Sequence, residues 1–411
     1  MKKICLVLAA VLLAVTLVAC LSACKTVDGI ILWWPSGRAY QSMINDVLAR
    51  FKQQHPDAKI TVQYKDIDAF EAYKYALNDD KTRPDVAIID HVYVQALARD
   101  NQILNLKDEG AEELKDKFPQ SLYNANVYKD GVYALPMSAN TVVLMVNRDI
   151  LKKCGVESIP TTFDELIAAC EKVEESGEIA FAQPKNSFAA MEFASYVSRN
   201  GGEMISADGK TALLDSDKVV KALQDWKRLS KFVNTNEYEE SKFYNGKVAF
   251  VEMGSWSLPK VTGSSKLFDC GFYEMVTIDP DLPNYSGLGL YSLCVARKTR
   301  DKELAVALAE FLATDKTVQL AFNKEKKLFP VTNEALADDY YANDDAFKVF
   351  ASQLNKVTPR PATPVWQSME SAIVNMLFEV VGSPSSAAAD IKAIAKKYQD
   401  NIQAEINRQA S

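Results

Sequence analysis

Two uninterrupted apolar runs constrain the fold more than any other feature of this sequence. One is VAII at residues 86–89, and the other is TVVLMV within residues 141–147. A strand with one face in water alternates apolar and polar residues, whereas a strand covered on both faces is apolar throughout. The two runs therefore predict strands in the interior of a sheet that carries helices on both sides.

Strands and helices alternate in the first part of the chain. The apolar run at residues 30–34 precedes apolar residues at helical spacing in 39–51, and residues 60–64 then alternate as in a strand. This order favours a packed α/β fold. Ligands of such sheets bind just beyond the carboxyl ends of the strands, which singles out residues 34–37 and Asp90 with His91.

Further along, two Pro- or Gly-rich stretches are expected to be chain crossings rather than regular elements. They span residues 133–140 and 280–289, and the second feeds a strand at residues 290–296. Thr162 and Glu165, three residues apart, predict a capping box at the start of a helix. A third break at residues 359–366 precedes a final set of amphipathic helices.

The N-terminus predicts export. Lys2 and Lys3 precede an apolar run at residues 4–21 that is too short for a confident membrane span. Cys24 follows two small residues, as at the cleavage site of bacterial lipoprotein signals, and Cys20 is the alternative acylation site. A plain secretory peptide with incidental cysteines is the competing interpretation. We expect residues 1–23 to be removed and the mature chain to be anchored by lipid.

Removing those 23 residues leaves 388 of the 411, which suits two domains. The mature chain keeps 45 of the 47 Lys and Arg residues against 54 Asp and Glu, a net charge of −9, which argues against a nucleic-acid partner. With only His55 and His91, neither a histidine-rich zinc site nor a Ser-His-Asp triad is expected.

The cysteines beyond Cys24 lie in apolar helix or strand patterns without close CxxC spacing, so metal binding is not expected. Buried free thiols are favoured, and a disulfide between Cys154 and Cys170 is the alternative. These cysteines are Cys154, Cys170, Cys270 and Cys294.

Several segments, in this order from about residue 28 to 405, resemble the extracellular solute-binding proteins of bacterial ABC importers, in the branch that includes the maltose-binding protein. The segments are YALPMSANTVVLMVNRDIL, PTTFDEL, NGKVAFVEMGSWSLP, GLGLYSLCVARKTRDKELAVALAEFLAT and RPATPVWQSMESAIVNMLFEV.

The resemblance implies a two-lobed periplasmic-binding-protein-like fold of type II, with mixed sheets flanked by helices and an interlobe cleft that closes on its ligand. It implies an N-terminal lobe of residues 24–137 plus 293–329 and a C-terminal lobe of 141–287 plus 333–405. The implied hinges are near residues 137–140, 288–293 and 328–332.

The resemblance also implies a monomeric receptor without catalysis or cofactor, anchored in the cell envelope, that delivers a small solute to permease and ATPase subunits. Trp256, Trp366 and Trp34 are then expected to face the cleft, with Trp34 preferred to Trp33 because it adjoins the loop. Tryptophan faces cover the CH face of a sugar ring, so a carbohydrate is the expected solute.

Polar candidates follow from the same resemblance, and each has a structural alternative. Asp90 is a hydroxyl acceptor or a helix cap, and Arg360 grips a hydroxyl or an anion, or is a surface residue. Tyr285 and Tyr291 reach the ligand or the hinge backbone. The remaining candidates are Asn140 in the first crossing and Ser36 before a helix.

Other solutes and one other activity stay open. A polyamine would suit the acidic balance, glycerol phosphate would use Arg360 and the helix N-terminus after Ser36, and the tyrosine pair in residues 338–341 is of a kind used for iron. A secreted carbohydrate-active enzyme would need two acids placed across a sugar cleft, and no such pair stands out in the sequence.

Overall fold

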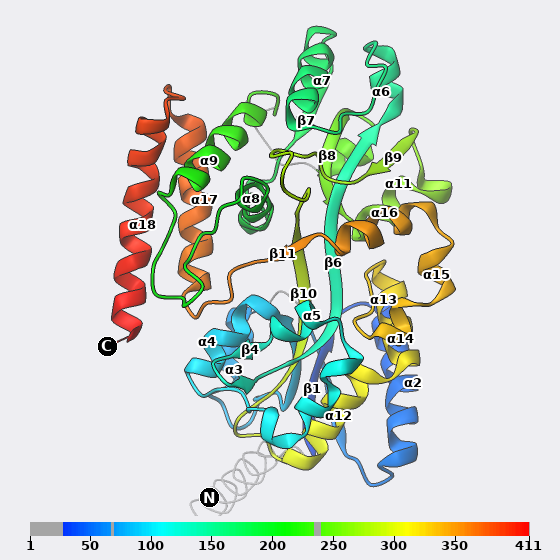
Figure 1. Cartoon of the computed structure of the whole chain (residues 1–411). Coiled ribbons are helices and arrows are strands. Elements are labelled where there is room, and N and C mark those ends of the chain that lie inside the picture. The colour runs from blue at the N-terminus through cyan, green and yellow to red at the C-terminus, as the bar shows by residue number, and fades with distance from the viewer. Residues whose placement is uncertain (1–27, 67–69, 234–239, 411) are drawn as a thin grey trace, which may run out of the picture.

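The computed structural model describes residues 28–66, 70–233 and 240–410. The expected signal segment and both candidate lipidation sites, Cys20 and Cys24, lie outside these residues. No helix within the described ranges combines the length and the apolar character that crossing a membrane would require. The fold is α/β, and Figure 1 shows two lobes joined through the long strands at the centre.

The helices and strands have the following bounds. The strands are β1 Ile30–Pro35, β2 Ile60–Lys65, β3 Val86–Asp90, β4 Val127–Tyr128, β5 Gly131–Val132, β6 Leu135–Asn147, β7 Ile179–Ala182, β8 Val248–Gly254, β9 Cys270–Tyr273, β10 Ser286–Val295 and β11 Val357–Pro359. The longer helices are α2 Arg38–Gln54, α7 Phe163–Glu175, α8 Ser187–Arg199, α9 Asp217–Ser230, α12 Lys302–Thr314, α13 Lys316–Lys326, α16 Asp345–Leu354, α17 Trp366–Gly382 and α18 Ala388–Ala410. The shorter helices include α3 Phe70–Ala76, α4 Val94–Arg99, α5 Gln120–Asn124, α6 Arg148–Lys153, α10 Glu240–Tyr244, α11 Leu258–Val261, α14 Asn333–Leu336 and α15 Asp339–Ala342, with the 3-10 turns η1 His91–Tyr93 and η4 Ser255–Ser257.

The main sheet is mixed and runs in the order β2-β1-β3-β10-β6-β8-β7, with β11 beside β10 and β9 beside β6. The pairs β1 with β2, β1 with β3 and β7 with β8 are parallel, whereas β6 and β10 pair antiparallel with each other. The first part of β6 pairs with β10, and its second part pairs with β8 and β9. One strand thereby links the two lobes.

The prediction of strands covered on both faces is confirmed. All thirteen residues of β6 are buried. In β1, Ile30, Leu32 and Trp34 pack in one core with residues of α2 and α13, while Ile31 and Trp33 pack in a second core with residues of α3 and α4. Successive side chains of a strand point to opposite faces, so both faces must be apolar when helices cover each of them.

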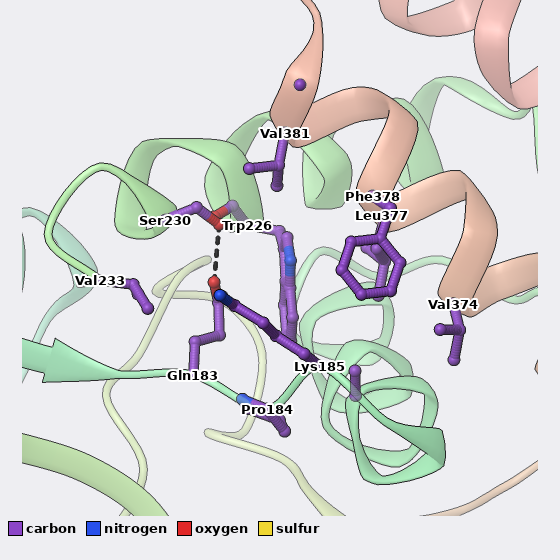
Figure 2. A pocket seen from close by; sticks show the side chains of 12 residues that line it. Gln183, Pro184, Lys185, Trp226, Ser230, Val233, Val374, Leu377, Phe378 and Val381 are labelled. Atoms are coloured by element: carbon purple, nitrogen blue, oxygen red, sulfur yellow. Dashed lines mark hydrogen bonds between the residues drawn. The ribbon is translucent and has the colours of Figure 1, made fainter. Parts of the chain in front are cut away.

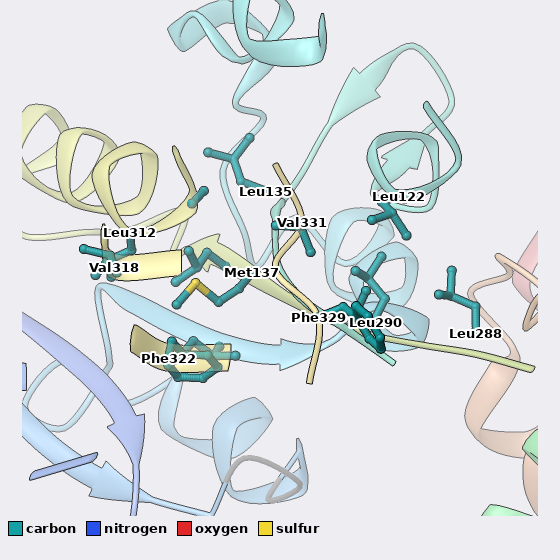
Figure 3. Close-up of a cluster of buried hydrophobic side chains, with 14 of the residues drawn as sticks. Leu122, Leu135, Met137, Leu288, Leu290, Leu312, Val318, Phe322, Phe329 and Val331 are labelled. Atoms are coloured by element: carbon teal, nitrogen blue, oxygen red, sulfur yellow. The ribbon is translucent and has the colours of Figure 1, made fainter. Parts of the chain in front are cut away.

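Three chain crossings meet at Ala139. Its N–H donates to Phe329 O at 2.9 Å, the Phe329 N–H donates to Ala139 O at 2.8 Å, and Leu290 of β10 is its partner on the other side. Figure 3 shows Met137, Leu290 and Phe329 in the hydrophobic cluster at this junction. The predicted hinge ranges include these residues, and the lobe boundaries themselves stay predictions.

The expectation that residues 133–140 and 280–289 are crossings without a regular element is wrong in part. β6 begins at Leu135 and continues through the crossing, and β10 begins at Ser286. Pro136 lacks an N–H and would interrupt a regular ladder, but the register between β6 and β10 shifts at Tyr291 and Ser292, opposite this proline. The irregularity accommodates proline inside a buried strand.

Two local predictions are confirmed. Thr162 and Glu165 form the reciprocal capping box at the start of α7, with the Glu165 N–H donating to Thr162 Oγ1 at 3.3 Å and the Thr162 N–H donating to Glu165 Oε2 at 3.1 Å. The four cysteines of the described residues are free, and Cys170, Cys270 and Cys294 are buried as predicted. Cys154 is partly exposed, which corrects its expected burial. Burial raises the pKa of the Cys294 thiol to about 12, which keeps it protonated and unreactive.

Candidate functional site

A cleft with a cavity volume of about 490 Å³ lies at the crossings, and both lobes contribute to its walls. The crossing strands supply its floor through Asn140, Gly289 and Tyr291. A Cβ at Gly289 would lie 2.1 Å from Asn140 Oδ1, so glycine at this position leaves room for the Asn140 amide. The floor therefore presents a side-chain amide, which can both donate and accept a hydrogen bond.

Trp256 forms the apolar wall. A Cβ at Gly254, the last residue of β8, would lie 1.8 Å from the indole, so the missing side chain lets the ring fold back over the strand end. The ring meets Phe188 edge to face, with centroids 5.6 Å apart, and packs against the cluster of Val142, Met191 and Met275. The glycine before the turn thus explains why a large indole follows it, half-buried and at the cleft.

An ion pair between buried Arg360 and partly exposed Asp90 forms the polar corner. Arg360 Nη2 donates to Asp90 Oδ1 at 2.7 Å and to Oδ2 at 2.6 Å, and His91 Nδ1 lies 3.0 Å from Asp90 Oδ1. Burial opposes the charged carboxylate, but Arg360 and His91 outweigh it and hold the pKa of Asp90 well below its ordinary value. The two charges of the pair therefore stay ionised and matched.

Glu370 adds a second carboxyl beside this corner. It lies one helical turn after Trp366 on α17, is half-buried and lines the cleft. Burial raises the pKa of Glu370, although Arg360 acts in the opposite direction. Glu370 is not among the residues predicted from the sequence. Its spacing of four from Trp366, which places both on one helix face, was the available signal.

The structure brings five of the predicted binding residues to the cleft. They are Asp90, Asn140, Trp256, Tyr291 and Arg360. The cap interpretation of Asp90 is confirmed, because its side chain accepts from the Val92 N–H at 3.4 Å at the start of η1. Its role as a hydroxyl acceptor stays a prediction. Sequence reasoning missed Asn186 and Phe188, although they follow β7 and begin α8, where the rule on carboxyl ends of strands could have found them.

The prediction that Trp34 faces the cleft is corrected. Its side chain is 1% exposed, its Nε1 donates to Tyr40 O at 3.1 Å, and its ring lies 5.3 Å from that of Phe322. Helix α13 returns to this face of β1 and covers the indole. Trp33, on the other face, is also buried.

Trp366 is likewise not on the cleft surface, since it is 1% exposed and is absent from the lining. The Arg360 guanidinium carbon lies over the Trp366 ring, 5.8 Å from the ring centroid. The indole therefore supports the polar corner from the core of the second lobe. Two further candidates fall outside the lining: Ser36 is exposed, and Tyr285 is half-buried with its N–H donating to Pro283 O.

A second hollow, of about 310 Å³, lies in the second lobe between α8, α9 and α17 (Figure 2). Trp226, Leu377 and Phe378 make it largely apolar, and Ser230 Oγ donates within it to Gln183 Oε1 at 2.6 Å. A polyhydroxylated ligand needs several converging polar groups. The cleft at the crossings meets that requirement better than this hollow.

Comparisons with known proteins bear on the same fold. Residues 46–349 match the family described as bacterial extracellular solute-binding protein. The chain is 24% identical over 376 residues to the maltotriose-binding protein of Pyrococcus abyssi, covering 89% of this chain and 79% of that protein. It is 24% identical over 432 residues to the maltodextrin-binding protein MdxE of Bacillus subtilis, covering 98% of both.

Among solved structures, the GacH receptor of Streptomyces glaucescens, crystallised without ligand and with acarbose, superposes with a TM-score of 0.78. It has 19% sequence identity, and the match covers 92% of this chain and 98% of that one. At this identity the likeness establishes the two-lobed fold and leaves the ligand to be argued from the cleft.

Proposed function

The chain belongs to the bacterial extracellular solute-binding protein family of ABC importers, and from this premise we propose that it captures a sugar or short oligosaccharide in the cleft at the crossings. One observation carries the proposal. A half-buried indole, Trp256, stands over a cleft whose floor and far corner present Asn140, Asp90 and Arg360. The names of the two sugar-binding relatives support the same solute class.

The chemistry of a sugar suits these walls. Its CH face is apolar and packs on an indole, while its hydroxyls both donate and accept hydrogen bonds. The Asn140 amide offers both a hydrogen-bond donor and an acceptor, and Tyr291 of β10 adds a phenol. Closure of the lobes about residues 137–140, 288–293 and 328–332 would then bring the two walls onto the ligand.

A carbohydrate-active enzyme is the second candidate, because Asp90 and Glu370 are two acids in one cleft whose pKa values are shifted in opposite directions. The pairing of Asp90 opposes this activity. Both of its oxygens accept from Arg360, so the carboxylate is not free to attack a sugar or activate water. Incubation with oligosaccharides tests the point, and cleavage products would favour the enzyme.

Trp256→Ala is expected to weaken sugar binding about 30-fold, which corresponds to roughly 2 kcal/mol for the loss of an aromatic anchor. Isothermal titration calorimetry of both proteins with maltose and maltotriose measures the effect. Trp256→Phe is the matched variant and should lose only about 3-fold, because a smaller aromatic face remains. Unchanged affinity of Trp256→Ala, with the sugar still bound, would remove the indole from the site.

We further propose that the mature chain is a monomer tethered through a lipid on Cys24, where it serves permease and ATPase subunits. The support is the sequence pattern before Cys24. Cys24→Ala should move the protein from the membrane fraction to the soluble fraction after export, whereas Cys20→Ala should not. The reverse pattern would assign the lipid to Cys20, and no change in either variant would contradict the anchor.

A further inference from the structure

Glu370 lines the cleft, and the cation beside it, Arg360, is already paired with Asp90. Arg360 is 6% exposed, and one of its terminal nitrogens donates to both oxygens of Asp90. No ion pair joins Glu370 to another residue of the described ranges. The charge of Arg360 is balanced by Asp90, so an anionic ligand would bring an uncompensated negative charge beside that of Glu370 at the same corner.

The remaining charge of the lining lies elsewhere. Lys326, at the end of α13, also lines the cleft, and its ammonium lies over the ring of Tyr40 at 5.4 Å from the centroid. With Glu370 ionised, Asp90, Arg360, Glu370 and Lys326 sum to zero over the whole cleft. The corner made by Asp90, Arg360 and Glu370 has a net charge of −1.

From this arrangement we propose that Glu370 sets ligand selectivity, admitting neutral polyhydroxylated ligands and excluding phosphorylated ones from its corner of the cleft. The inference rests on the proposed function. A carboxylate accepts a hydrogen bond from a sugar hydroxyl, whereas a phosphate offers no proton at neutral pH and adds like charge. Specificity by unfavourable placement of like charges is a recurrent device in binding sites.

The same residue makes the selectivity depend on pH. Burial favours the protonated form of Glu370, so its charge, and with it the exclusion of anions, weakens as pH falls toward the raised pKa. The charged or titratable groups around this corner are Arg360, Asp90 with His91 behind it, and Tyr93 of η1. Asp90 stays ionised over the same range because its own pKa is held low.

The experiment compares wild type, Glu370→Gln and Glu379→Gln. Glu379 lies on the same helix, pairs with Lys397 at the surface and is remote from the lining, so it is the matched control. Maltose, trehalose and sucrose are titrated alongside their 6-phosphates at pH 8 and pH 5. Glu370→Gln should lower the ratio of neutral to phosphorylated affinity about tenfold at pH 8, because the amide removes the like charge that opposes the phosphate.

The pH comparison provides a measurement that a merely structural role would not change. The ratio of neutral to phosphorylated affinity should fall between pH 8 and pH 5 by more in wild type than in Glu370→Gln. Titration of the phosphate itself affects both proteins alike, so the difference between them reports on Glu370. If a neutral sugar binds and the ratio of neutral to phosphorylated affinity is the same in wild type and Glu370→Gln at both pH values, this inference alone is overturned. Binding of none of the three neutral sugars to wild type would overturn the proposed function, and this inference with it.

Discussion

Trp366→Ala is expected to lower the free energy of unfolding by about 3–5 kcal/mol, the range for removing a fully buried Trp or Phe. The indole is 1% exposed and packs in the core of the second lobe behind Arg360. Truncation leaves a cavity in this core, and that adds to the lost burial of the indole. Urea unfolding followed by circular dichroism, with both the midpoint and the slope fitted, measures the change.

Two variants test whether this effect comes from packing. Trp366→Phe keeps most of the buried volume and should cost less than half as much. Trp256→Ala, at the half-buried cleft indole, should cost less than Trp366→Ala and lose affinity instead. A small stability loss for Trp366→Ala, combined with a large affinity loss, would return Trp366 to the ligand site and contradict the structural placement.

Arg199→Met is expected to destabilise the second lobe by about 3–5 kcal/mol, because it leaves a buried carboxylate without its counter-charge. The side chains of Arg199 and Glu252 are 0% and 1% exposed, and Nη2 of the arginine lies 3.4 Å from Glu252 Oε1. Arg199 also donates to Val276 O at 3.2 Å and stacks on Tyr196 at 4.3 Å. It joins α8 to β8 through these contacts.

The loss should depend on pH in a defined direction. Burial raises the pKa of Glu252 in the folded protein and Arg199 lowers it, so the substitution raises this pKa further. A carboxyl with a raised folded pKa contributes stability at low pH that is lost as pH rises from its unfolded value, about 4.3, through the folded one. Arg199→Met should therefore be more destabilising at pH 8 than at pH 5.

Two controls accompany the measurement. In the double variant Arg199→Met with Glu252→Leu, an apolar pair should recover most of the lost stability and remove the added pH dependence. Lys392→Met removes an exposed partner of Asp217 and should change stability by less than about 1 kcal/mol. Equal losses for Arg199→Met at both pH values would contradict the account based on Glu252.

The sequence determined the elements and the fold class because those depend on local patterns. The apolar runs placed β3 and the second half of β6 in the sheet interior, and Thr162 with Glu165 marked the start of α7. The resemblance to solute-binding proteins predicted that Trp256 faces the cleft. Trp256 reaches the cleft because its indole folds over Gly254, two residues before it, which is a local cause.

Tertiary structure decided which of the other candidate side chains reach the cleft and how they pair there. Trp34 was a reasonable choice beside a loop, yet α13, almost 290 residues later in the chain, covers it with Phe322. Arg360 acquires its partner Asp90 across 270 residues, and only this pairing gives Glu370 an unmatched charge at the same corner. A residue pattern specifies a buried or exposed face, but which neighbour covers that face depends on contacts between distant segments, and local periodicity carries no information about those contacts.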